Sequence, residues 1–71
     1  MKQVIEYIDR TEYQGILLDD QRYYTGVEIL NDNRIPIELE VYDDEGELVL
    51  DKNIIESIDE YINRYAAAFM G

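Results

Sequence analysis

Carboxylates are the side chains in this sequence that could do the most chemistry. Ten of the 17 acidic residues lie between Glu38 and Glu60, where Lys52 is the only cation, and the formal net charge of the 71-residue chain is −11 at pH 7. Such an excess creates a negative field that attracts basic proteins and repels nucleic acid and anionic membranes. We therefore predict a basic protein partner, which includes the class of nucleic-acid-binding proteins, and no direct binding to nucleic acid or membrane.

Residue types that commonly perform catalysis are scarce. The sequence has no His and no Cys, so the hydroxyl groups of Ser57, Thr11 and Thr25 have no histidine base to activate them. Paired carboxylates such as Glu38 and Glu40 could do acid–base chemistry only in a pocket, and a domain of this size rarely encloses the ~300 Å³ that ligand sites need. We predict a protein that is not an enzyme, with no catalytic residue and no cofactor.

Metal and phosphate sites are also not indicated. The stretch Asp43-Asp44-Glu45-Gly46-Glu47 has the composition of a calcium loop, but aligning its glycine with the sixth EF-hand position places Val41 where an oxygen ligand is required. The glycines do not have the spacing of a phosphate loop. The lack of cysteine fits a reducing compartment, and no apolar run approaches the ~20 residues that span a bilayer. We expect a cytoplasmic protein without a metal site.

The elements that must position these carboxylates are short strands and one helix. The length predicts a single domain over residues 1–71. Segments rich in β-branched and aromatic residues, separated by turn residues, predict strands at residues 13–18, 23–30, 35–42 and 47–50. Residues 4–8 predict a fifth strand, or a short helix, because Val4, Ile5 and Ile8 also share a helical face.

Hairpin registers follow from the positions expected for the turns. We expect a two-residue turn at Asp20-Gln21, a three-residue loop at residues 31–33 with Asn33 in the left-handed region, and a turn at residues 43–46. All three registers place aliphatic side chains on one face of an antiparallel meander. The expected pairs are Leu18 with Tyr23, Ile16 with Thr25, Gly15 with Gly26, Ile29 with Ile35, Val27 with Ile37, Thr25 with Leu39, Val41 with Leu48, and Leu39 with Leu50.

The last segment has the spacing of an amphipathic helix. Its apolar stripe consists of Ile54, Ile55, Ile58, Tyr61, Ile62, Tyr65 and Phe69. Asn53 and Glu56 have the arrangement of a capping box, and Asp51 adds favourable charge near the helix start. The fold class is therefore α+β: a four- or five-stranded antiparallel β-meander, open or closed into a small barrel, packed by one C-terminal helix. The expected core is Ile37, Leu39, Val41, Ile58 and Ile62.

The same registers place tyrosines and carboxylates together on the opposite face. Because aromatic residues are enriched in interface cores, we predict that this face binds the partner. Its acidic cluster is either a solvated surface or a binding surface. Like charges on neighbouring strands destabilise a sheet, so their presence here favours a binding surface. The Gly15/Gly26 pair has three interpretations: a sharp coil of the sheet, two glycines covered by the side chain of a neighbouring aromatic residue, or a slot for a partner's side chain. The predicted partner-binding residues are Tyr13, Leu17, Tyr24, Glu28, Glu38, Glu40, Tyr42, Glu47 and Asp51.

Two functions fit these features. The first is a small acidic protein-binding module or inhibitor that docks on a basic surface of a target, including DNA mimicry by spaced carboxylates. Small, cysteine-free acidic domains of this kind occur among phage-encoded anti-defence proteins; the likeness is one of size and charge. The alternative is a homo-oligomeric structural or assembly protein that pairs through an open edge strand.

Overall fold

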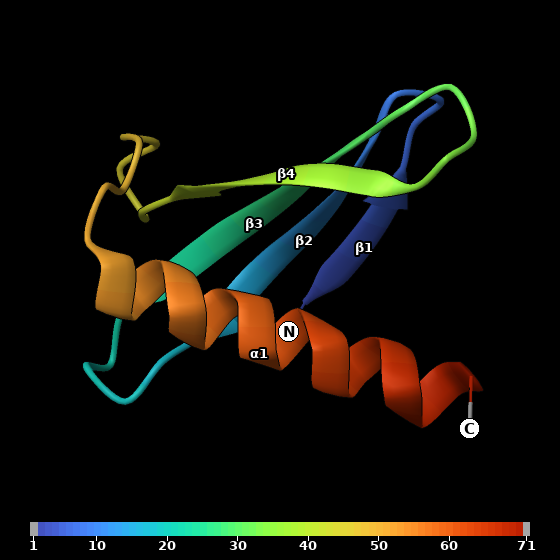
Figure 1. The fold of residues 1–71 in the computed structure, drawn as a ribbon. Helices are drawn as coiled ribbons and strands as arrows, with labels where there is room; N and C mark the ends of the chain where they lie inside the picture. Colours follow the sequence, from blue (N-terminus) through green and yellow to red (C-terminus); the bar gives the residue numbers. More distant parts are fainter. Residues whose placement is uncertain (1, 71) are drawn as a thin grey trace.

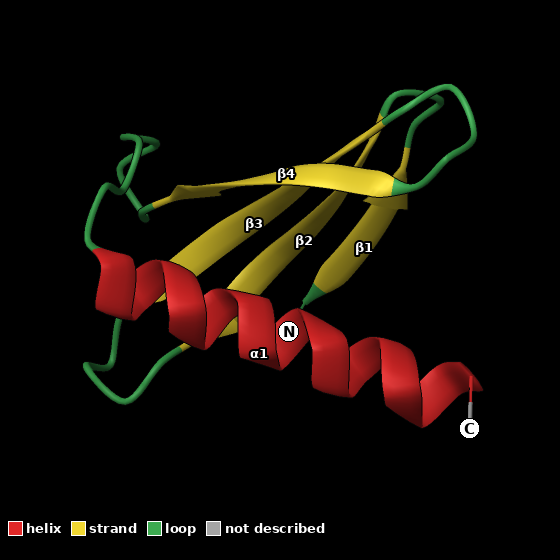
Figure 2. Ribbon diagram, in the orientation of Figure 1, coloured by secondary structure: helices red, strands yellow, loops and turns green. Residues whose placement is uncertain are grey.

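The computed structural model describes residues 2–70, with the backbone alone at residues 69 and 70, so the side chain of Phe69 lies outside the described residues. Four strands, β1 (Gln3–Glu6), β2 (Arg10–Leu17), β3 (Tyr23–Leu30) and β4 (Pro36–Tyr42), form one antiparallel sheet in the order β1-β2-β3-β4. Helix α1 (Lys52–Met70) lies across one face of the sheet (Figures 1 and 2). The α+β fold is confirmed in its four-stranded form, and the sheet is not closed into a barrel.

Two of the expected strands differ from the observed ones: one is shorter and one does not form. The segment at residues 4–8 is a strand, β1, that already ends at Glu6. Residues 47–50 do not form a strand and pair with β4 through a single bridge between Leu48 and Tyr42. The chain then turns directly into α1, so the strand expected at residues 47–50 is absent, whereas the one expected at residues 4–8 is present as β1.

The β2–β3 and β3–β4 hairpins and the turn that follows β4 share one loop geometry, whereas the β1–β2 connection is a tighter turn in which the Tyr7 N–H donates to the Arg10 carbonyl. Each of the three similar loops has three residues, and the last of them, Gln21, Arg34 or Gly46, has a positive φ of 65°, 61° or 81°. Three-residue hairpin loops are commonly a type I turn followed by a left-handed residue, and the positive φ at the third position fits this class. In the second and third loops the side chain of Asn31 or Asp43 accepts hydrogen bonds from two backbone N–H groups of the loop. The expected left-handed conformation of Asn33 was wrong, because the loop lies one residue later and Arg34 takes this position.

A β-bulge in β2 changes which side chains face the helix. Tyr13 pairs with Gly26 and Ile16 pairs with Tyr24, so Gln14 and Gly15 together oppose Thr25. Gly15 has a φ of +72°, and a Cβ there would lie 2.6 Å from Cγ of Lys2. Glycine suits both the left-handed backbone and the close approach of the lysine stem. Because of the extra residue, Tyr13 and Ile16 both face α1.

The expected registers were wrong at all three hairpins. The three loops lie at residues 19–21, 32–34 and 44–46 rather than where they were expected, and together with the bulge at Gly15 and the register shift between Ile29 and Leu30 they move every pairing. Because side chains alternate along a strand, an odd shift exchanges the two faces. Leu48 and Leu50 are exposed rather than buried, whereas Val49 packs against the core. The observed pairs include Tyr13 with Gly26, Ile16 with Tyr24, Thr25 with Tyr42, Val27 with Glu40, Glu28 with Leu39, and Tyr42 with Leu48.

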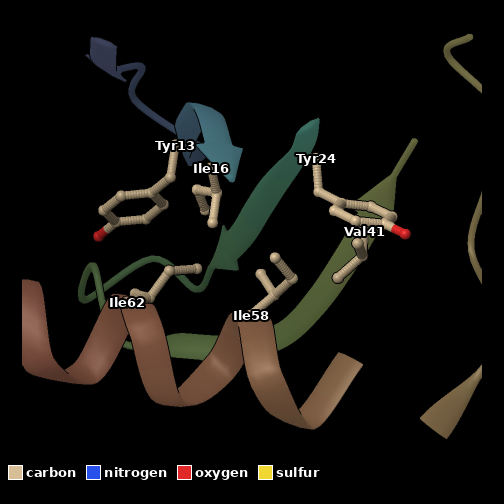
Figure 3. Close-up of a cluster of buried hydrophobic side chains, with 6 residues drawn as sticks. All are labelled: Tyr13, Ile16, Tyr24, Val41, Ile58 and Ile62. Carbon is tan, nitrogen blue, oxygen red and sulfur yellow. The ribbon is translucent and has the colours of Figure 1, made fainter. Parts of the chain in front are cut away.

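The core lies between the sheet and α1 and contains two tyrosine rings. Figure 3 shows Ile58 and Ile62 of the helix pointing toward Tyr13, Ile16, Tyr24 and Val41 of the sheet. The buried positions of Val41, Ile58 and Ile62 confirm three of the five expected core residues, and Leu39 packs at their margin. The placement of Ile37 in the core was wrong, because its side chain remains 65% exposed near the start of β4.

Helix α1 begins one residue after its cap. The carboxylate of Asp51 accepts a hydrogen bond from the Asn53 N–H at 2.9 Å, and the Asp51 carbonyl accepts one from the Ile55 N–H at 3.0 Å. Asp51 is therefore the N-cap, a role that was expected for Asn53. The helix then crosses β3 closely at Gly26, where a Cβ would lie 2.9 Å from Cδ1 of Ile62 and 3.0 Å from Cγ2 of Ile58. The slot at Gly26 is filled by the protein's own helix.

Candidate protein-binding face

The face of the sheet opposite α1 carries apolar and charged side chains together. On β3, Gly26 faces the helix, so the adjacent Thr25 and Val27 point the other way, as does Ile29. On β4, Glu40 pairs with Val27 and Tyr42 with Thr25, which places both on the same side. We call this surface the open face. It consists of Arg10, Glu12, Gln14, Thr25, Val27, Ile29, Glu38, Glu40 and Tyr42.

A hollow lies in the open face over β2, β3 and β4. Its volume is about 460 Å³. Val27 is 7% exposed although it lies outside the core cluster, so neighbouring side chains of the open face cover it. This gives the hollow an apolar floor in a sheet face that no second layer covers. The lining residues are Arg10, Glu12, Gln14, Thr25, Val27, Ile29, Glu40, Tyr42, Asp43 and Gly46.

The hollow is acidic because its one guanidinium group is already paired. Arg10 Nε lies 3.1 Å from Oε2 of Glu12, and its Nη1 lies 3.0 Å from Oδ1 of Asp9. Gln14 donates a further hydrogen bond to Glu12 at 3.2 Å. The two carboxylates raise the pKa of Arg10, with the Glu12 hydrogen bond as the largest cause. The lining carboxylates of Glu40 and Asp43 are left without a cation from the hollow itself.

Hydrogen bonds from a tyrosine hydroxyl and from backbone N–H groups position the carboxylates of Glu40 and Asp43 at the rim of the hollow. Tyr42 OH donates to Oε1 of Glu40 at 3.2 Å, and partial burial together with the Glu40 charge raises the pKa of Tyr42. Asp43 Oδ1 accepts from the N–H groups of Glu47 and Glu45, each at 2.9 Å, and these bonds, with the more distant Arg22, lower the pKa of Asp43. The lowered pKa keeps the Asp43 carboxylate ionised near neutral pH, so this part of the rim is negative.

Of the nine predicted site residues, the structure brings three together on the open face: Glu38, Glu40 and Tyr42. The surface placement of Tyr13 and Tyr24 was wrong. Their side chains are 8% and 2% exposed, and their hydroxyl groups donate to Glu28 at 2.9 Å and to Asp20 at 2.6 Å. These carboxylates allow a polar ring to be buried, because a buried hydroxyl group needs a hydrogen-bond partner.

The other predicted residues lie apart from this cluster. Glu28 is on the helix side of β3 and is bonded by Tyr13, and Asp51 is the helix cap. Glu47 is exposed in the connection between β4 and α1. Leu17 is partly exposed at the end of β2 and lines a second hollow of about 420 Å³ between the β2–β3 loop and α1. Leu17 and Glu47 therefore do not belong to the open face.

Sequence reasoning missed most of the hollow. Arg10, Glu12 and Gln14 precede the bulge, and the expected registers placed Val27 and Ile29 on the aliphatic face that was to pack against the helix. The signal that could have identified them is Gly15, because an isolated glycine within a strand pattern often marks a bulge. With the bulge placed there, Tyr13 and its partner Gly26 face the helix. Because side chains alternate along a strand, Thr25, Val27 and Ile29 of β3 then lie on the open face.

Comparisons with other proteins do not assign this face a function. Within residues 2–70, no group of three or more Asp or Glu side chains is arranged to hold a metal ion. No helix in that part of the chain has the length and apolar character needed to cross a membrane. A scan against family models and searches of curated proteins and of solved structures find no match to this chain.

Proposed function

We propose that the protein is a small acidic binding module that docks its open face on a basic surface of a target protein. The observation that carries the proposal is the hollow, in which a buried Val27 forms the floor and the carboxylates of Glu40 and Asp43 stand at the rim. A desolvated apolar centre with a polar border is the usual composition of a protein interface. A sheet face with this composition is suited to a partner that brings both aliphatic and cationic groups.

The charge of the chain supports the choice of partner. A net charge of −11 on 71 residues accelerates encounter with a cationic surface and disfavours association of two copies through the same face. Arg10 does not offset this effect, since it is paired with Glu12 and Asp9. A target that binds nucleic acid has such a surface, so inhibition by occupying a nucleic-acid site is the narrower form of this proposal.

Selection of random displayed peptides on the immobilised protein tests the proposal. We expect the parent protein to enrich peptides that combine lysine or arginine with aliphatic residues. A variant with Glu38→Lys and Glu40→Lys should lose this enrichment. The matched control carries Glu56→Lys and Asp59→Lys, which make the same change in charge on exposed positions of α1. The control should still enrich basic peptides.

Two outcomes would contradict the proposal. If the open-face variant and the helix control lose enrichment equally, the parent protein attracts basic peptides only through its total charge. If the parent protein enriches no basic peptide, the open face is a solvated surface. Circular dichroism of both variants checks that neither result comes from unfolding.

A further inference from the structure

Strand β4 forms an edge of the sheet, and most of this edge is free. Its only neighbour within the sheet is β3 (Figure 2). The following segment reaches it only near its end, where the Val49 N–H donates to the Val41 carbonyl at 2.8 Å and the Asp43 N–H donates to the Glu47 carbonyl at 2.9 Å. Toward the start of β4, Pro36 and a register shift interrupt regular pairing. The part of the edge between these two ends is centred on Leu39.

The direction of the backbone groups at Leu39 follows from its neighbours. Val41 and Asp43 direct hydrogen-bonding groups away from β3, toward residues 47 and 49. Backbone groups of an extended strand alternate in direction, so the N–H and C=O of Leu39 also point away from β3. Among the described residues, no chain segment pairs with Leu39 on that side. These groups form a site at which one further strand can be added.

The two sides of this free edge have different chemistry. Glu38 and Glu40 lie on the open face, and within the described residues Glu38 makes no side-chain hydrogen bond or ion pair. Leu39 lies on the helix face, where its Cδ1 would be 3.8 Å from a Cβ on Gly26. Ile37 is 65% exposed beside it. A strand added here would meet two carboxylates on one side and aliphatic side chains on the other.

We propose that β4 receives an extended segment of the partner by strand addition, and that this segment has an aliphatic residue between two cationic residues. The inference rests on the proposed function, because it names the binding mode of the same basic partner. A second copy of β4 is a poor occupant. Antiparallel pairing centred on Leu39 places Glu38 of each copy opposite Glu40 of the other, and directly opposed like charges destabilise a sheet.

The test uses a short synthetic peptide with valine between two arginines and threonines at the ends. In an antiparallel complex centred on Leu39, the valine N–H donates to the Leu39 carbonyl, whereas the N–H groups of the arginines point away. We expect N-methylation of the valine to weaken binding roughly tenfold. N-methylation of one arginine is the matched control and should leave affinity nearly unchanged. Hydrogen exchange of the Leu39 amide should slow when the unmodified peptide binds.

Each alternative outcome separates this inference from the proposed function. If the peptide binds but both methylated peptides bind equally well, strand addition is wrong while the basic partner remains supported. If the unmodified peptide and the peptides selected by display all fail to bind, both proposals are wrong. Sedimentation of the protein alone provides a further check: a dimer that depends on the Leu39 edge would overturn the inference, because the occupant would then be a second copy.

Discussion

Replacing Gly26 with alanine tests how closely α1 approaches the sheet. The new methyl group would lie 2.9 Å from Cδ1 of Ile62 and 3.0 Å from Cγ2 of Ile58, both well inside normal contact. Overpacking of this kind costs about 1–3 kcal/mol. The smaller conformational entropy of alanine in the unfolded chain returns roughly 0.4–1 kcal/mol. We expect a net loss of about 1–2 kcal/mol in the free energy of unfolding.

Urea and thermal unfolding followed by circular dichroism measure this loss. For a domain of this size it corresponds to a decrease in Tm of roughly 4–16 °C. Ile62→Val removes the Cδ1 atom that the new methyl group would meet. Ile62→Val alone should cost about 0.5–1.5 kcal/mol. We expect the double variant to lose less free energy of unfolding than the two single variants lose together. Strict additivity, or a Gly26→Ala variant as stable as the parent, would refute the close packing of helix on strand.

The remaining predictions concern the core and the dependence of stability on pH. Ile58→Ala should cost about 2–5 kcal/mol because its side chain is fully buried, whereas Ile37→Ala should cost less than about 1 kcal/mol in the same urea unfolding assay; equal losses would contradict the placement of α1. The pKa values of Asp20 and Asp43 are lowered in the fold, mainly by a hydrogen bond from the Tyr24 hydroxyl to Asp20 and one from the Glu47 backbone N–H to Asp43. Their contribution to stability is therefore present above their unfolded pKa near 3.8 and is lost as the pH falls through the lower folded values. Burial raises the pKa of Tyr13, so its contribution is present below its unfolded pKa near 10 and is lost at higher pH. Tm measured across this range should fall at both extremes, and Asp20→Asn should flatten the acid limb; an acid limb unchanged by that substitution would contradict the role of the Asp20 carboxylate.

The sequence predicted those elements whose periodicity is not interrupted. The apolar stripe of α1 has regular spacing and extends over several turns, so the inward positions of Ile58 and Ile62 were correct. The second half of β4 follows its register shift and alternates without a break, so Val41 faced the core and Glu38 and Glu40 faced the other side as predicted. Of these two elements, β4 supplied the correct part of the candidate site.

The remaining registers depended on backbone conformations that residue types do not reveal. Gln21 and Arg34 adopt a positive φ, which is uncommon for residues other than glycine, asparagine and aspartate. The bulge at Gly15 adds one residue to β2. The predicted registers also assumed that aliphatic side chains are buried in preference to tyrosines. Here Tyr13 is buried, which its hydrogen bond to a distant carboxylate makes possible, and no local sequence pattern indicates that bond.

The carboxylates of Asp20, Asp43, Asp51 and Glu28 differ from that of Glu38 in their physical constraints. Asp20, Asp43 and Asp51 accept hydrogen bonds from backbone N–H groups, and Glu28 accepts one from a buried tyrosine, so the fold itself requires an acceptor at each of these positions. Glu38 is exposed on an edge strand and has no such role among the described residues. A negative charge there repels a second copy and leaves a cationic strand as the favoured neighbour. Hydrogen bonding within the fold thus explains those four carboxylates, whereas the proposed addition of a cationic strand would give Glu38 its role.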